Sequence, residues 1–88
     1  MSDDQPIEAS DLRRLKWRCR RGLLENDLFV QRFFDRFEQQ LSVRQGKALT
    51  QLMNLADNDL LDLLLGRSAL QGALDVPDVR QVLHMLRS

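Results

Sequence analysis

The sequence contains few of the residues that form tight turns and flexible linkers. Its 88 residues include four glycines and two prolines. Turns between strands and disordered linkers use Gly and Pro heavily, so this composition leaves little room for either. A chain of this length forms one domain that buries about 60% of the surface of its unfolded chain, which is too little for a deep substrate cavity.

The chain has a single cysteine and a single histidine, and this limits the chemistry it can perform. Cys19 cannot form an intramolecular disulfide, which fits a reducing compartment. Its place among arginines would lower the pKa of the thiol, but its spacing from Leu12 and Leu15 favours a small buried hydrophobe. His84 has no Cys, Asp or Glu near it at metal-ligand spacing, which favours a residue on a helix face. The sequence therefore predicts neither a metal site nor a catalytic centre, and we expect no enzyme.

Long apolar runs are also missing from the sequence. No segment approaches the roughly 20 apolar residues of a membrane span. The first ten residues, MSDDQPIEAS, are acidic and polar, unlike a signal or transit peptide. We therefore expect a soluble cytoplasmic protein that does not insert into a membrane, with a flexible arm over residues 1–9 and a single helical domain over residues 10–88.

Positive charge is concentrated in one short segment. Six of the 13 Lys and Arg lie in residues 13–21, the sequence RRLKWRCRR, whereas all 13 Asp and Glu lie outside it. The rest of the chain therefore carries seven positive and 13 negative charges, so a basic segment precedes an acidic body.

Apolar residues recur every three or four positions, which predicts an all-α bundle of about five short helices. Ser10 is the expected cap of a first helix over residues 11–21, and Gly22 the left-handed residue after it. A second helix is expected over about residues 26–41, with a face of Val30, Phe33, Phe34, Phe37 and Leu41.

Three further helices are predicted after residue 41. The sequence SVRQ, residues 42–45, has the form of a capping box, so a third helix begins at Val43. Its expected inward residues are Leu49, Leu52, Met53 and Ala56. A fourth helix, capped by Asp57 or Asn58, ends at Gly66, and residues 67–76 form a partly helical connection. Pro77 lies in the first turn of the last helix, which buries Val79, Val82, Leu83 and Leu86.

Trp17 lies nearly opposite Leu12 and Leu15 when the basic segment is wound as a helix. If those leucines face the core, Trp17 faces outward among arginines, a composition enriched at protein interfaces. The alternative is that a later helix or the N-terminal arm covers Trp17 and the arginine stems extend over its edges.

Nucleic acid is a second class of partner that basic and aromatic residues fit. A pI near 6.6 and an acidic body would repel phosphates outside one narrow strip. No helix-turn-helix pattern follows the basic segment. We therefore expect that the protein does not bind nucleic acid. The alternative functions are a regulatory module that does bind nucleic acid through the basic segment and a partner protein that neutralises a toxin.

The segment RRGLLENDL, residues 20–28, resembles the R-G-x-x-E signature of the SdhE/YgfY-type flavinylation factors of succinate dehydrogenase. The resemblance covers about residues 11–86. It includes the preceding W-x-C-R-R-G sequence, the Phe33-Phe34 pair and the acidic segment DNDLLDLL, residues 57–64. Leu61 and Leu63 stand where the family usually has an aromatic pair, which puts an aromatic contact there in doubt.

This resemblance implies a monomeric assembly factor without a catalytic site of its own. Such a factor binds the immature flavoprotein subunit of succinate dehydrogenase and promotes covalent attachment of FAD to a histidine of that subunit. Fumarate reductase flavoproteins are the second class of client that it suggests. The chain has no glycine-rich phosphate loop, so we expect no tight binding of FAD, which is the cofactor of the client.

The resemblance places Arg21, Gly22 and Glu25 at the client interface. Read from the residues alone, Gly22 could be only a helix stop, and Glu25 only a favourable charge at the N-terminus of the second helix. A bare backbone beside Arg21 and Glu25 would also let a partner approach closely. The expected partner-binding residues are Trp17, Arg18, Arg20, Arg21, Gly22 and Glu25.

Overall fold

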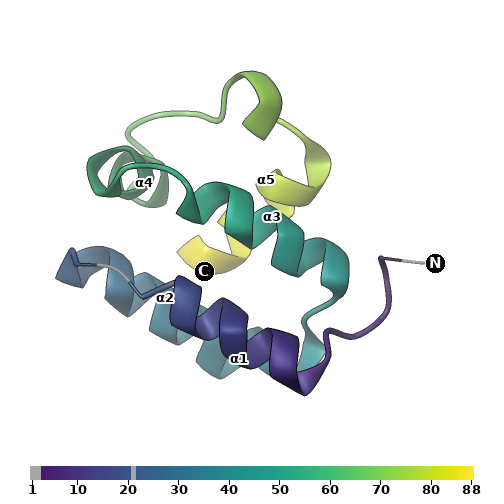
Figure 1. The fold of residues 1–88 in the computed structure, drawn as a ribbon. Helices are drawn as coiled ribbons and strands as arrows, with labels where there is room; N and C mark the ends of the chain where they lie inside the picture. The colour runs from purple at the N-terminus through teal and green to yellow at the C-terminus, as the bar shows by residue number, and fades with distance from the viewer. Residues whose placement is uncertain (1–2, 21) are drawn as a thin grey trace.

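A computed structural model of the chain describes residues 3–20 and 22–88. The elements of this part are α1 (Ala9–Arg18), α2 (Leu24–Phe37), α3 (Val43–Met53), α4 (Asp57–Leu64) and α5 (Pro77–Arg87), with short 3₁₀ helices η1 (Glu38–Gln40) and η2 (Gly72–Leu74). Helix α1 packs on α3, α2 packs on α4 and α5, and α3 packs on α5 (Figure 1). The predicted all-α bundle of five helices is confirmed.

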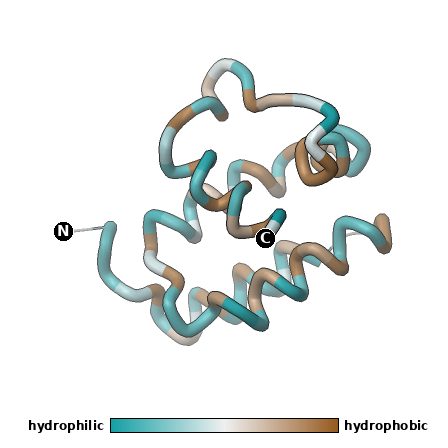
Figure 2. Tube along the Cα trace, turned by 180° about the vertical axis from the view of Figure 1, so that it is seen from behind, coloured by the Kyte–Doolittle hydropathy of each residue, from teal (hydrophilic) through white to brown (hydrophobic). Residues whose placement is uncertain are grey.

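The core lies where α2, α3 and α5 meet. Phe33 of α2 is 1% exposed, and Leu49 of α3 and Val82 of α5 are fully buried. The Phe33 ring meets the Phe34 ring edge to face, with 5.3 Å between centroids. Such edge-to-face pairs add stability beyond the buried area alone. Along each helix the hydrophobic residues recur between hydrophilic ones, as expected of helices with one buried face (Figure 2).

The beginning of α3 follows the sequence prediction. Ser42 Oγ accepts from the backbone N–H of Gln45 at 3.2 Å, and Gln45 Oε1 accepts from the N–H of Ser42 at 3.0 Å. This capping box satisfies two N–H groups that the first turn leaves unpaired. The predicted inward residues are confirmed at Leu49, Leu52 and Met53, but Ala56 is exposed, because α3 ends at Met53 and the chain turns before α4.

Gly46 lies in α3 because α1 and the N-terminal arm approach it closely. A Cβ at this position would lie 3.2 Å from Cδ1 of Ile7 and 3.5 Å from Cδ2 of Leu15. Glycine lowers helix propensity by about 1 kcal/mol relative to alanine, so its presence here reflects packing. The side chains of Ile7 and Leu15 fill the space that a larger residue would need.

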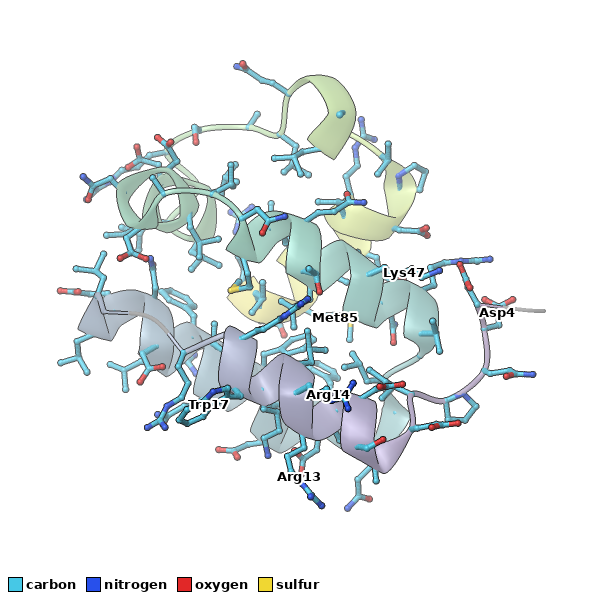
Figure 3. All side chains as sticks on the ribbon, in the orientation of Figure 1. Asp4, Arg13, Arg14, Trp17, Lys47 and Met85 are labelled. Carbon is cyan, nitrogen blue, oxygen red and sulfur yellow. The ribbon has the colours of Figure 1, made fainter. Side chains whose placement is uncertain are left out.

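Residues 3–8 of the N-terminal arm are held against the beginning of α3. The N–H of Ile7 donates to the carbonyl of Leu41 at 3.0 Å, and the N–H of Val43 donates to the carbonyl of Gln5 at 2.9 Å. Lys47 Nζ lies 3.2 Å from a carboxylate oxygen of Asp3. Asp4 and Lys47 mark this contact at the N-terminal end of the molecule (Figure 3).

The predicted bounds of α1 are wrong at both ends. The helix begins at Ala9 with Glu8 as its N-cap, and Ser10 lies inside the first turn. Because the hydrogen bond of Ile7 to Leu41 fixes the preceding chain, the helix starts before the serine. It ends at Arg18, with the fully buried Cys19 as its C-cap.

The sequence predicted that Gly22 directly follows the first helix, and this prediction is wrong. Because α1 ends at Arg18, Gly22 lies four residues later, on the connection that leads to α2. The left-handed glycines of the described residues are Gly66, with φ of 76°, and Gly72, with φ of 60°. Gly66 follows α4, as the sequence predicted for a helix stop.

The beginnings of α2 and α4 differ from the prediction. Helix α2 begins at Leu24 because Leu23 is extended and its carbonyl accepts from the N–H of Asp27 at 3.1 Å. It ends at Phe37, and a 3₁₀ turn continues to Gln40. Helix α4 has Ala56 as its N-cap, and Asp57 is its first helical residue, where its charge favours the helix N-terminus. Pro77 begins α5 as predicted.

Within residues 3–20 and 22–88, no helix has the length and apolar character needed to cross a membrane.

Candidate partner-docking surface

Trp17 is exposed on the outer face of α1. Its side chain is 70% exposed, because the opposite face of the helix buries Leu15 and Cys19. In Figure 3 the side chains of Trp17 and Arg13 project from α1 on the side away from α3. The alternative in which another segment covers Trp17 is therefore wrong.

Arg20 lies against Trp17. The guanidinium carbon of Arg20 is 4.9 Å from the centroid of the Trp17 ring, a cation–π contact. Arginine stacked in this way keeps the N–H donors at the edge of its guanidinium for a partner. The structure thus brings together two of the predicted docking residues, an apolar anchor and a cation.

Arg18 lies on a different side of α1. Together with Trp17 it borders a depression toward α3, lined also by Ile7, Gly46 and Thr50. Arg20 instead lines the groove between α1 and α2. Trp17 lines both depressions and so stands on the ridge between them.

The groove between α1 and α2 has a volume of about 890 Å³. Its floor is apolar and includes Leu12, Cys19, Val30 and Phe34. Trp17 and Arg20 line its end near the connection between the two helices. It is larger than the depression toward α3, which has a volume of about 470 Å³, and it lies beside the predicted docking residues Trp17 and Arg20.

The two walls of this groove carry opposite charges. The basic residues along α1 and the connection are Arg13, Arg14, Lys16 and Arg20. The acidic residues along α2 and η1 are Asp27, Asp35 and Glu38. One ion pair of the described residues crosses the groove, between Lys16 Nζ and a carboxylate oxygen of Glu38 at 2.7 Å. Both partners are partly exposed, so the pair contributes about 0–1 kcal/mol.

Gly22 and Glu25 are both exposed at the beginning of α2. Apart from its chain neighbours, a Cβ added to Gly22 would meet no atom of the described residues within 4 Å, so these residues leave open space at this position. Glu25 lies in the first turn of α2, where a negative charge is favoured. Arg21, the remaining predicted docking residue, lies outside the described residues.

Asn26, a neighbour of Glu25, is the one polar residue in the buried core of the described chain. It is fully buried, and its Nδ2 donates to the carbonyl oxygen of Asp57 at 2.9 Å. Its Oδ1 is buried and has no hydrogen-bond partner among the described residues. Asn26 therefore fixes the first turn of α2 against the first turn of α4.

Leu24 and Leu28 add exposed apolar surface that the sequence interpretation missed. Their side chains are 66% and 52% exposed. They lie four residues apart, so they are neighbours on one face of α2. A helical wheel would have shown them opposite Phe33, on the solvent side. The N-terminal end of α2, which carries them, extends beyond the end of α1 (Figure 1).

The remaining candidates for chemistry fit structural roles. Cys19 is fully buried, as its spacing predicted, and His84 is exposed on α5. Among residues 3–20 and 22–88, no three His, Cys, Asp or Glu residues are grouped so that they could hold a metal ion.

Comparisons with known proteins identify the family of the chain. The family described as flavinator of succinate dehydrogenase matches residues 13–88. A protein of Ralstonia nicotianae named FAD assembly factor SdhE is 63% identical over 75 residues, covering 85% of this chain and 79% of its own. Proteins of the same name in Aliivibrio fischeri and Legionella pneumophila are 36% identical over 58 residues and 42% identical over 53 residues. These matches cover 66% and 60% of this chain and 67% of each relative. No solved structure matches the chain.

Proposed function

The chain belongs to the succinate dehydrogenase flavinator family of FAD assembly factors, and we propose that it binds the immature flavoprotein subunit of that enzyme and promotes its covalent flavinylation. The observation that carries this proposal is the exposed Trp17 with Arg20 stacked on it at 4.9 Å. Exposed Trp and Arg are the residues most enriched at the centres of protein interfaces. Trp17 is exposed because Leu15 and Cys19 lie on the buried face of α1, so most of the indole surface is available to a partner.

Gly22 and Glu25 extend this docking surface. The open space beside Gly22 lets the backbone of the client come close, and Glu25 offers a carboxylate in the adjacent turn. The matched region, residues 13–88, includes all the predicted docking residues. We therefore keep Arg18 and Arg21 in the proposed surface, with Arg18 on the α3 side of Trp17.

The proposed contribution of this protein is positioning. Docking would stabilise an arrangement of the client in which a client histidine lies close to the flavin methyl group. Holding two reacting groups together in this way lowers the entropic cost of the reaction. The client supplies the histidine and holds the FAD, and the factor shifts the client toward the reactive conformation. Under this proposal the factor has no catalytic centre and binds no FAD tightly by itself.

The proposed oligomeric state, location and further partners of the protein are those expected from the sequence. The factor acts as a monomer in the cytoplasm, and fumarate reductase flavoproteins are its second class of client. Nucleic acid is not a partner, because the body outside the basic segment carries 13 acidic residues against seven basic ones.

The decisive experiment follows covalent flavin on the purified client. Apo-flavoprotein subunit and FAD are mixed with or without the factor, and covalent flavin is measured by in-gel fluorescence. Faster flavinylation with the factor is the expected result. If the factor does not change the rate of flavinylation of either client class, and if it binds a nucleic acid with nanomolar affinity, the regulatory alternative would be supported instead.

A further inference from the structure

The groove between α1 and α2 has unsatisfied charge on both of its walls. Arg13 on the basic wall and Asp35 on the acidic wall are exposed, and neither takes part in an ion pair of the described residues. Arg20 has its stacking contact with Trp17, and Asp27 accepts from Nε2 of Gln31 at 3.2 Å. The Lys16–Glu38 pair joins the two walls, so a third element would lie over this pair, and the other facing charges are available to it.

Each wall presents charge of mainly one sign to the groove. On the wall formed by α2 and η1, the carboxylates of Asp27, Asp35 and Glu38 are interrupted by the neutral amide of Gln31. On the opposite wall, Arg13 and Lys16 are three residues apart on α1, and Arg20 follows beyond the helix end at Arg18. Residues three or four apart on a helix are neighbours, so Arg13 and Lys16 share one side of α1, and Gln31 lies next to Asp27 and Asp35 on α2. An elongated occupant would meet positive charge along one edge and negative charge along the other.

The surroundings of the groove favour a helix over an extended strand. Both walls are mainly helical, and helices bond their own backbone N–H and C=O groups internally. They offer no sheet edge, so a strand placed in the groove would bury unpaired backbone groups. A helix brings its own backbone hydrogen bonds.

Trp17 is an apolar residue at the open end of the groove, where it is 70% exposed. Leu24 and Leu28 are exposed on the projecting end of α2 and lie outside the lining of the groove. An occupant with a stripe of apolar residues would cover Trp17 and meet the floor at the partly exposed Leu12, because Val30 and Phe34 are only 3% and 4% exposed.

We propose that this groove receives one amphipathic helix of the client flavoprotein, with acidic residues along the edge that faces α1 and basic residues along the edge that faces α2. This inference rests on the proposed function and assigns to it a recognition mode. The apolar stripe of the client helix supplies affinity, and the two charged edges fix its direction, because complementary charges steer and orient association. Turning the helix end for end would place like charges together on both walls.

Charge reversal on each wall tests the proposal with purified apo-flavoprotein as the probe. Arg13→Glu and Asp35→Arg are each expected to weaken binding about tenfold, the effect of one lost and one repulsive contact. The matched controls are Arg67→Glu and Asp59→Arg, two exposed positions outside the groove. They are expected to bind within about twofold of the unmodified protein, and thermal melts check that all four variants fold.

A photo-crosslinker identifies the occupant. Benzoylphenylalanine in place of Gln31, which lies between Asp27 and Asp35 on the acidic wall, is expected to crosslink one helical client segment with acidic and basic edges. The same group in place of Gln71, at η2, is the control and should crosslink little. Crosslinks from Gln31 to a client strand or loop, or to a second copy of this chain, would overturn the proposal.

The outcomes separate this inference from the proposed function. If Trp17→Ala weakens binding but Arg13→Glu and Asp35→Arg do not, the groove assignment is wrong and the docking function stands. If the unmodified protein fails to bind the client, both the function and the groove assignment are wrong.

Discussion

Arg20 places its guanidinium carbon 4.9 Å from the ring centroid of Trp17, so a charged side chain and an exposed apolar one form a single unit. The stacking uses the face of the guanidinium and leaves its N–H donors at the edge. A client carboxylate could bind those donors while apolar client atoms cover the indole. Arg20 would thus orient the client through its hydrogen bonds, and Trp17 would contribute affinity through apolar contact at the same point of the surface.

Trp17→Ala should weaken client binding mainly by faster dissociation. The exposed indole contributes little to the folded monomer, so the free energy of unfolding should change by less than about 1 kcal/mol. Loss of an interface anchor costs about 2 kcal/mol or more, which corresponds to a roughly 30-fold weaker complex. Surface plasmon resonance measures both rates. A slower association with unchanged dissociation would contradict the anchor role.

Arg20→Gln and Arg18→Gln should mainly slow association. Complementary charge accelerates encounter, and salt screens it over a Debye length of about 8–10 Å at physiological ionic strength. The association rate of the unmodified protein should therefore fall as salt rises, and fall less steeply in the two variants. Arg67→Gln, on the connection between α4 and α5, is the control and should keep the original salt dependence. Equal salt dependence of all four proteins would exclude steering by the basic segment.

Glu25→Ala should separate binding from stability. The side chain is exposed, and its charge near the N-terminus of α2 contributes about 0.3–1 kcal/mol. The melting transition should stay close to that of the unmodified protein, while client binding and covalent flavinylation fall sharply. Thermal melts and the fluorescence assay are made on the same preparation. An unfolded variant, or one that flavinylates the client normally, would remove Glu25 from the interface.

Much of the core could be predicted because it depends on periodicity within single helices. Phe33, Leu49 and Val82 lie on apolar faces that the sequence displays directly, and all three are buried. The capping box of Ser42 and Gln45 is likewise a local signal. Exposure of Trp17 followed from its position opposite Leu15 on the same helix.

The remaining features depend on contacts between distant segments. The beginning of α1 follows from the hydrogen bond between Ile7 and Leu41, which no pattern within residues 9–18 reveals. Asn26 looks like a surface residue in the sequence, yet it binds the carbonyl of Asp57, 31 residues away. The groove exists because α1 and α2 turn particular sides toward each other, and that rotation is set by their packing on other helices.

Asn26→Ala should destabilise the fold by about 1–3 kcal/mol. The change removes a fully buried side chain and its hydrogen bond to Asp57. Asn26→Leu should cost less, because a side chain of similar size fills the site and the unpaired Oδ1 is lost. Urea unfolding compares both with Asn58→Ala, an exposed position on α4. If Asn26→Ala unfolds at the urea concentration of the unmodified protein, the buried contact does not hold α2 to α4.

Leucine at Gly46 and at Gly22 should have opposite effects on stability and binding. At Gly46 the new Cβ would lie 3.2 Å from Cδ1 of Ile7, and the rest of the side chain would meet the packed side chain of Leu15. Overpacking of this kind costs about 1–3 kcal/mol, so this variant should unfold more easily.

At Gly22 nothing lies within 4 Å of the added Cβ, so the free energy of unfolding should change by less than about 1 kcal/mol. Gly22→Leu should nevertheless weaken client binding, because its side chain occupies the space into which the client backbone fits. Urea unfolding and surface plasmon resonance test the pair. Normal client binding by Gly22→Leu would show that the client does not approach the chain at this glycine.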